Sequence, residues 1–137
     1  MGRIEFRDEI VIQDGHPLRV LDGDTIDYRD VRYRLAGYDS PERRGGSLQE
    51  RRMAQIAAFR LSWLLKPHNV RVLKVLGRRD KYGRAVAQLL VNGEDVAVIA
   101  VREMWGQAYT KGRRASWSSP EVVAAMLARP PISPGAA

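Results

Sequence analysis

Residues 18–35, Leu-Arg-Val-Leu-Asp-Gly-Asp-Thr-Ile-Asp-Tyr-Arg-Asp-Val-Arg-Tyr-Arg-Leu, decide how this chain folds. Apolar and polar side chains alternate along the stretch, which is typical of strands with one buried face. The alternation is interrupted at two sharp corners, Asp22-Gly23-Asp24 and Arg29-Asp30. The stretch therefore predicts strands at 18–21, 25–28 and 31–35, of which the last two form a hairpin.

The pattern on either side of this stretch supplies the other elements. Upstream, Asp14-Gly15 predicts a turn that connects a strand at 10–12 to the strand at 18–21. Downstream of a loop at 37–46, apolar residues recur every three or four positions, which predicts a helix from Ser47 that ends before Pro67. Ser47 and Glu50 form a capping box at its start. The remaining predictions are strands at 70–76 and 85–91, a short helix capped by Asp95 and running through Val101, and a helix at 121–127.

This order of elements predicts a mainly β fold with α: a five-stranded OB-type barrel with two to three packed helices. We expect a single domain over residues 1–128, with the motif-bearing core at about 18–110. Residues 129–137 are expected to be a disordered tail.

The composition limits the chemistry. Without cysteine, the chain has no disulfides, zinc thiolates or cysteine nucleophiles. His16 and His68 do not cluster, so no histidine-based metal site is expected. The net charge is +7, which fits binding to nucleic acid or another polyanion, or simply a solvated basic surface. No window approaches the apolar run of a membrane span, and residues 1–10 are charged and lack the apolar stretch typical of a signal peptide. The chain as given is expected to be soluble and cytoplasmic, or secreted or periplasmic if a leader has been removed.

Three charged segments stand out from the apolar pattern. Residues 22–25 place two carboxylates at a strand corner, where a glycine allows close approach of the backbone. Residues 34–42 combine an arginine with two further acidic residues. Residues 78–84 hold four cationic residues, a tyrosine and a glycine. Taken singly, each segment is explained as well by turn chemistry, a solubilising loop or a solvated charge run.

Taken together and in this order, the segments resemble the staphylococcal nuclease (thermonuclease) family. The resemblance covers roughly residues 20–109. Its most specific parts are Asp-Gly-Asp-Thr at 22–25, Arg-Leu at 34–35, Asp-Ser-Pro-Glu at 39–42 and Asp-Lys-Tyr-Gly-Arg at 80–84. The resemblance implies an OB-type barrel with three helices that hydrolyses DNA and RNA with calcium.

The resemblance also implies a metal site. Asp24 and Asp39 match the carboxylates that bind a single calcium ion in the family. Ser40 stands where the family usually has threonine and contributes its backbone carbonyl. Glu42 matches the glutamate beside the attacking water, acting as general base or as a positioner of that water. Oxygen ligands of this kind suit calcium better than zinc.

Further residues match the family's substrate contacts. Arg34 and Arg84 match the two arginines that bind the scissile phosphate. Lys81 and Tyr82 match residues that hold a terminal phosphate of the nucleotide, and Tyr109 is aligned more loosely with a tyrosine of the substrate pocket. Two guanidinium groups and a cation would stabilise the charge added in the transition state, which is what catalysis of this reaction requires.

The resemblance therefore implies a calcium-dependent endonuclease with little sequence specificity. Its partners would be DNA and RNA, single-stranded or in a frayed duplex, with no small-molecule cofactor and no membrane, and we expect a monomer. One alternative is a catalytically inactive module of the same fold that binds nucleic acid or protein. Another, a generic single-strand binder, needs aromatic stacking platforms, which are few here.

Beyond Tyr109 the chain departs from the family's pattern, because the usual long final helix is absent. The predicted helix at 121–127 carries an apolar set, and we expect it to cover an apolar patch of its own chain or of a partner subunit. That set consists of Val122, Val123, Met126 and Leu127.

Overall fold

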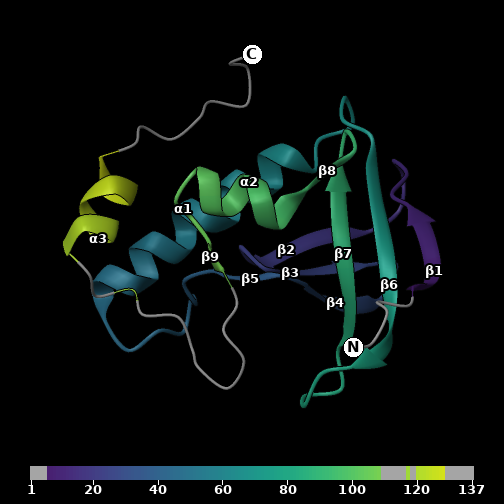
Figure 1. Cartoon of the computed structure of the whole chain (residues 1–137), viewed down its shortest axis with the longest axis horizontal. Coiled ribbons are helices and arrows are strands. Elements are labelled where there is room, and N and C mark those ends of the chain that lie inside the picture. The colour runs from purple at the N-terminus through teal and green to yellow at the C-terminus, as the bar shows by residue number, and fades with distance from the viewer. Residues whose placement is uncertain (1–5, 109–116, 118–119, 129–137) are drawn as a thin grey trace.

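The computed structural model describes residues 6–108, 117 and 120–128 (Figure 1). Its elements are β1 (Phe6–Val11), β2 (Leu18–Asp22), β3 (Thr25–Tyr28), β4 (Val31–Leu35), β5 (Tyr38–Asp39), α1 (Leu48–Leu64), β6 (Arg71–Arg79), β7 (Ala85–Val91), β8 (Glu94–Asp95), α2 (Val96–Arg102), β9 (Gln107–Ala108) and α3 (Pro120–Leu127).

Every strand and helix predicted from the sequence is present. The limits of three strands differ: β1 covers Phe6–Val11 rather than 10–12, β2 ends at Asp22 rather than at 21, and β6 covers Arg71–Arg79 rather than 70–76. The structure adds the short strands β5, β8 and β9, which are too brief for an alternating pattern to indicate them. The expected tail at 129–137 lies outside the described residues.

The main sheet has a mixed order, β1-β6-β7-β4-β3-β2. Its neighbours are antiparallel except for β4 and β7, which are parallel with Tyr33 opposite Ala85. Figure 1 shows β2 and β3 running across the direction of β6 and β7. The two edge strands, β1 and β2, are consecutive in the chain, so the sheet curves to bring its two edges towards each other.

This architecture confirms the predicted fold class, a mainly β protein with packed helices that is consistent with an OB-type arrangement. In the described residues the main sheet has seven strands, with β8 pairing β7, rather than the five predicted. Among the strand pairs of the described residues, no ladder joins β1 to β2. The sheet is accordingly barrel-like, and hydrogen bonds between these two strands do not close it.

The core lies on one face of the curved sheet because side chains alternate along each strand. Ile26, Tyr28 and Leu35 are fully or almost fully buried. Asp27 and Arg34, their neighbours along β3 and β4, belong to the opposite face. The alternation that builds the core therefore also places a charged row on the outer face.

Helix α1 packs one side against the sheet through Met53, Ala57 and Leu61, all of them buried. The predicted cap is present, since the Ser47 hydroxyl accepts a hydrogen bond from the Glu50 amide at 3.0 Å. This bond satisfies one of the amides that have no partner within the first turn of a helix. No described helix is both long and apolar enough to cross a membrane.

The final helix, α3, packs against α1. Val123 and Met126 of α3 are buried, and they join the same core as Trp117. The helix thus covers a patch of its own chain, which is one of the two roles expected for it. Leu127 remains partly exposed.

Gly23 lies where the corner between β2 and β3 meets α1. A Cβ atom at Gly23 would be 2.7 Å from the Ala57 Cβ and 2.9 Å from the Ser40 Cβ. We expect Gly23→Ala to destabilise the protein by about 1–3 kcal/mol, the usual cost of overpacking, as measured by urea unfolding. Gly46→Ala is the matched control, because nothing lies within 4 Å of the added Cβ. Equal losses in the two variants would contradict the prediction.

Candidate active site

The centre of the site is Arg34, which contacts two carboxylates. Its Nη2 donates a hydrogen bond to Asp39 Oδ1 and lies 3.4 Å from Asp24 Oδ2. The three residues come from different places in the chain: the corner after β2, strand β4 and strand β5. They meet because Thr25, next to Asp24, pairs with Arg34 across β3 and β4. All three side chains are less than a fifth exposed. The Arg34 guanidinium therefore offsets part of the cost of burying each carboxylate.

Backbone contacts fix the position of this cluster. The Ser40 amide donates to Asp24 Oδ2 at 2.9 Å, and the Tyr38 hydroxyl donates to the Gly23 carbonyl. Short strand β5 is held in turn by pairing with β9, with Asp39 opposite Gln107. The predicted metal-site residues Asp24, Asp39 and Ser40 are therefore brought together.

Two further acidic residues lie beside the cluster. Asp22 accepts a hydrogen bond from the Arg43 amide at 3.0 Å. Partial burial raises the pKa of Asp22, and the charges of Asp24 and Glu42 raise it further. Glu42 is itself exposed to solvent. Asp22 was not among the predicted site residues, although the Asp-Gly-Asp corner was the signal that could have included it.

The loop that carries Glu42 is anchored to the start of α1. The Glu42 amide donates to the Glu50 carboxylate at 3.3 Å, and Arg51 donates to the Gly45 carbonyl at 3.1 Å. Gly45 approaches Glu50 so closely that an added Cβ would lie 2.5 Å from its carboxyl carbon. Glu50 thus links the helix to the loop, a role that its place in the capping box did not reveal.

Arg84 is held by a second acidic residue that sequence reasoning missed. Asp80 Oδ2 accepts from Arg84 Nε at 2.6 Å, while its Oδ1 accepts from the amides of Tyr82 and Arg84. Partial burial acts to raise the pKa of Asp80, but the hydrogen bonds from Arg84 outweigh it and hold the pKa below its usual value. The ring of Tyr82 lies 5.2 Å from Lys81 Nζ and 5.3 Å from the Arg84 guanidinium carbon.

The parallel pairing of β4 with β7 relates this loop to Arg34. Arg34 is opposite Val86, so Arg84 precedes by two residues the position beside Arg34 and lies on the same face of the sheet. The structure therefore places Arg84 just before the strand position beside Arg34, and places Lys81 and Tyr82 next to Arg84. Tyr109 lies outside the described residues.

The donor set can be tested for a metal ion. No group of three or more His, Asp or Glu side chains with metal-binding geometry occurs in the described ranges. The oxygens at hand are nevertheless of the right chemistry for a hard cation: two carboxylates, on Asp24 and Asp39, that already share one positive group, and the backbone of Ser40 bonded to one of them. The residues therefore fit calcium by the type of their donors.

The described residues thus form a mainly β fold with packed helices, in which an arginine lies between two carboxylates and a cationic loop follows β6. The chain belongs to the family of staphylococcal nuclease homologues, whose model matches residues 32–125. This range contains all the predicted site residues except Asp24 and continues past Tyr109 into α3. A search of curated proteins gives no match.

The raised pKa of Asp22 predicts a pH-dependent effect on stability. Between the ordinary value of 3.8 and the raised one, the folded protein binds more protons than the unfolded chain, so stability falls as the pH rises through this range. Asparagine carries no charge, and its amide oxygen can still accept the bond from Arg43. We expect Asp22→Asn to raise the thermal midpoint at about pH 7 but not at about pH 3, below the ordinary value.

The control for this measurement is Asp30→Asn. Asp30 is exposed in the β3–β4 turn at a φ of 67°, which asparagine also tolerates. Any effect of this substitution should be the same at both pH values. A midpoint difference for Asp22→Asn that does not change with pH would sink the interpretation.

Proposed function

We propose that this protein is a calcium-dependent phosphodiesterase that hydrolyses DNA and RNA with little sequence specificity. The observation that carries the proposal is the convergence of Asp24, Arg34 and Asp39 from three separate segments. Membership of the staphylococcal nuclease homologue family supports it. The net charge of +7 favours a polyanionic substrate.

The Asp24 and Asp39 carboxylates, with the Ser40 carbonyl, would hold one calcium ion. Such an ion polarises a phosphoryl oxygen and helps to orient water. The Ser40 amide already orients the Asp24 carboxylate, and β9 supports the strand that carries Asp39. These supports lessen the reorganisation that binding an ion would require.

Arg34 and Arg84 would bind the scissile phosphate. Each guanidinium offers several N–H donors in a plane, and this geometry matches the oxygens of a phosphate. The transition state carries more negative charge than the substrate, so arginines held in place stabilise it preferentially. Asp39 and Asp80 hold the two side chains in position, which fixes their geometry before the substrate arrives.

Glu42 would act on the attacking water, as a general base or by positioning it. Its backbone is anchored to α1 through Glu50, while its side chain is exposed on the loop near Asp22. A carboxylate in such a place can accept a proton from water as the new bond to phosphorus forms.

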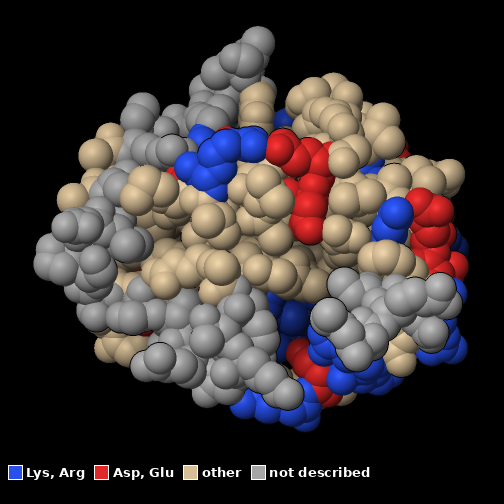
Figure 2. Space-filling view, viewed as in Figure 1, with Lys and Arg blue, Asp and Glu red and all other residues tan. Residues whose placement is uncertain are grey.

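Lys81 and Tyr82 would contact a second phosphate of the nucleotide, and Tyr109, which lies outside the described residues, would contribute to the substrate pocket as the family resemblance implies. The first two residues are exposed on the hairpin between β6 and β7, as are Arg78 and Arg79. In Figure 2, cationic side chains gather along the lower edge of the molecule. A strand that is single or has frayed from a duplex would reach such a surface, and a monomer would suffice for the activity.

The proposal is tested by digesting single-stranded DNA with calcium, with EDTA and with Glu42→Gln in calcium. We expect cleavage that requires calcium and falls by at least about a hundredfold in the variant, the lower range for loss of general base catalysis. Glu94→Gln, an exposed glutamate of β8 paired with Arg102, is the matched control. A folded protein that binds the strand but cleaves it under no condition would instead favour a catalytically inactive binding module.

The contact between Asp80 and Arg84 gives a second test. Without the carboxylate, Arg84 loses its anchor, so Asp80→Ala should lower kcat/KM by about a hundredfold, as expected for a misplaced catalytic group. In an Arg84→Ala background the same substitution should cost much less, because Asp80 acts through Arg84. Additive losses in the double variant would show that Asp80 has a separate role. Thermal midpoints of all variants control for folding.

A further inference from the structure

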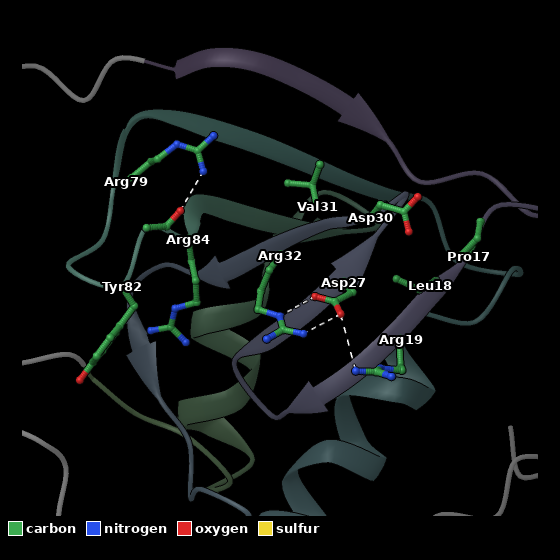
Figure 3. A pocket seen from close by; sticks show the side chains of 11 residues that line it. Pro17, Leu18, Arg19, Asp27, Asp30, Val31, Arg32, Arg79, Tyr82 and Arg84 are labelled. Atoms are coloured by element: carbon green, nitrogen blue, oxygen red, sulfur yellow. Dashed lines mark hydrogen bonds and ion pairs between the residues drawn. The ribbon is translucent and has the colours of Figure 1, made fainter.

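A groove of about 1000 Å³ runs along the outer face of the sheet beside the candidate active site. It lies between the strands β2, β3 and β4 and the hairpin that joins β6 to β7 (Figure 3). Arg84 lines one part of it, and Arg19, Asp27 and Arg32 line another. The groove thus extends from a residue of the proposed active site to three charged residues that the proposed function does not use.

These three residues form a ladder across the strands. Asp27 of β3 pairs with Arg19 of β2 on one side and with Arg32 of β4 on the other. Arg32 makes two parallel hydrogen bonds to Asp27, of 2.8 and 3.0 Å, and Arg19 Nη2 lies 3.8 Å from Asp27 Oδ2. Figure 3 shows both guanidinium groups directed towards the one carboxylate. One negative charge is shared by two positive ones, and the ladder keeps a net positive charge.

The groove as a whole is also cationic. The side chains lining it include four arginines, namely Arg19, Arg32, Arg79 and Arg84, but only two carboxylates, those of Asp27 and Asp30. The Arg32 and Arg19 side chains are 49% and 72% exposed, so their remaining N–H groups can reach a ligand. Exposed ion pairs contribute little to stability, and one carboxylate does not need two arginines for that purpose. The excess of exposed donors favours an anionic ligand.

The ladder continues the row that contains the proposed catalytic arginine. Arg32 and Arg34 are two residues apart on β4, so both side chains lie on the same face, about 6.6 Å apart along the strand. This separation is similar to the step between neighbouring phosphates of an extended nucleic-acid strand. A strand with one phosphate at Arg34 and Arg84 would therefore bring a neighbouring phosphate to Arg32.

We propose that Arg19 and Arg32, held by Asp27, form a subsite for a further phosphate of the same nucleic-acid strand that is cleaved. The inference rests on the proposed function, because it takes the scissile phosphate to lie at Arg34 and Arg84. The subsite recognises the phosphodiester backbone and not the bases, since a planar guanidinium pairs with phosphate oxygens whatever the sequence. It makes the enzyme prefer strands of several nucleotides to a dinucleotide.

The test compares Arg32→Gln and Arg19→Gln with the wild type for binding of an eight-nucleotide oligothymidylate. Fluorescence anisotropy in EDTA, at several salt concentrations, measures the affinity without cleavage. We expect each variant to bind about tenfold more weakly, the usual effect of losing a hydrogen bond to a charged group. The slope of log affinity against log salt should fall in magnitude by about 0.7, as expected when a single strand loses one phosphate contact.

Arg102→Gln is the matched control. Arg102 makes the same kind of exposed two-bond ion pair, to Glu94 at 2.7 and 3.1 Å, but does not line the groove. It should leave the affinity for the octanucleotide unchanged. If Arg32→Gln and Arg19→Gln match this control, the subsite is refuted. Arg19→Gln keeps the test decisive if Arg32→Gln proves unstable, because Arg19 makes only a long contact to Asp27.

Cleavage in calcium separates this inference from the proposed function. If the subsite exists, Arg32→Gln should lower kcat/KM relative to the wild type about tenfold more for the octanucleotide than for a thymidine dinucleotide. Equal losses for the two substrates would overturn the subsite and leave the nuclease intact. If the wild type cleaves neither substrate but Arg32→Gln still weakens binding, the proposed function fails and the phosphate contact stands.

Discussion

The site depends on one guanidinium group, that of Arg34, lying against two carboxylates in a place with little access to water. Asp24 and Asp39 would repel each other if they stood alone there, and removal of one partner from a buried set of charges is costly. Arg34 resolves this conflict because β4 delivers its side chain between the corner after β2 and strand β5. The two carboxylates thereby lie close together around one guanidinium group.

The surrounding structure keeps these charges in place. Tyr38, buried in the core, reaches the Gly23 carbonyl, and a few residues on, the Ser40 amide bonds Asp24. A side chain at position 23 would collide with Ala57 of α1 and with Ser40, so the close packing at this corner requires glycine. The first helix, the corner and the site therefore share one packing arrangement, and a change that loosens one of them alters the others.

Local patterns allowed much of this arrangement to be predicted. The alternation at 18–35 gave three strands, the Ser47 cap gave the start of α1, and the spacing of four short motifs indicated the family, which the match at 32–125 confirms. The contacts of Asp80 and Glu50 could not be foreseen in this way. Each depends on how a loop folds back on itself or on a distant helix, and the identity of a residue does not encode that. The two-residue strands β5 and β9 are too brief for an alternating pattern, and they pair across about half of the chain.

The outer face of β3 and β4 follows from the rule that builds the core. Tyr33 and Leu35 are buried in the core, and because side chains alternate along a strand, Arg32 and Arg34 lie on the opposite face. A shift of register by one residue would exchange the two sets. The hydrophobic effect thus fixes where the arginines stand, although it acts on their neighbours. The burial of Tyr33 and Leu35 therefore leaves Arg32 and Arg34 in a row on the outer face, separated by the two-residue repeat of the strand. An extended chain of phosphates, whose own charges are spaced at a similar interval, is the ligand that such a row matches best.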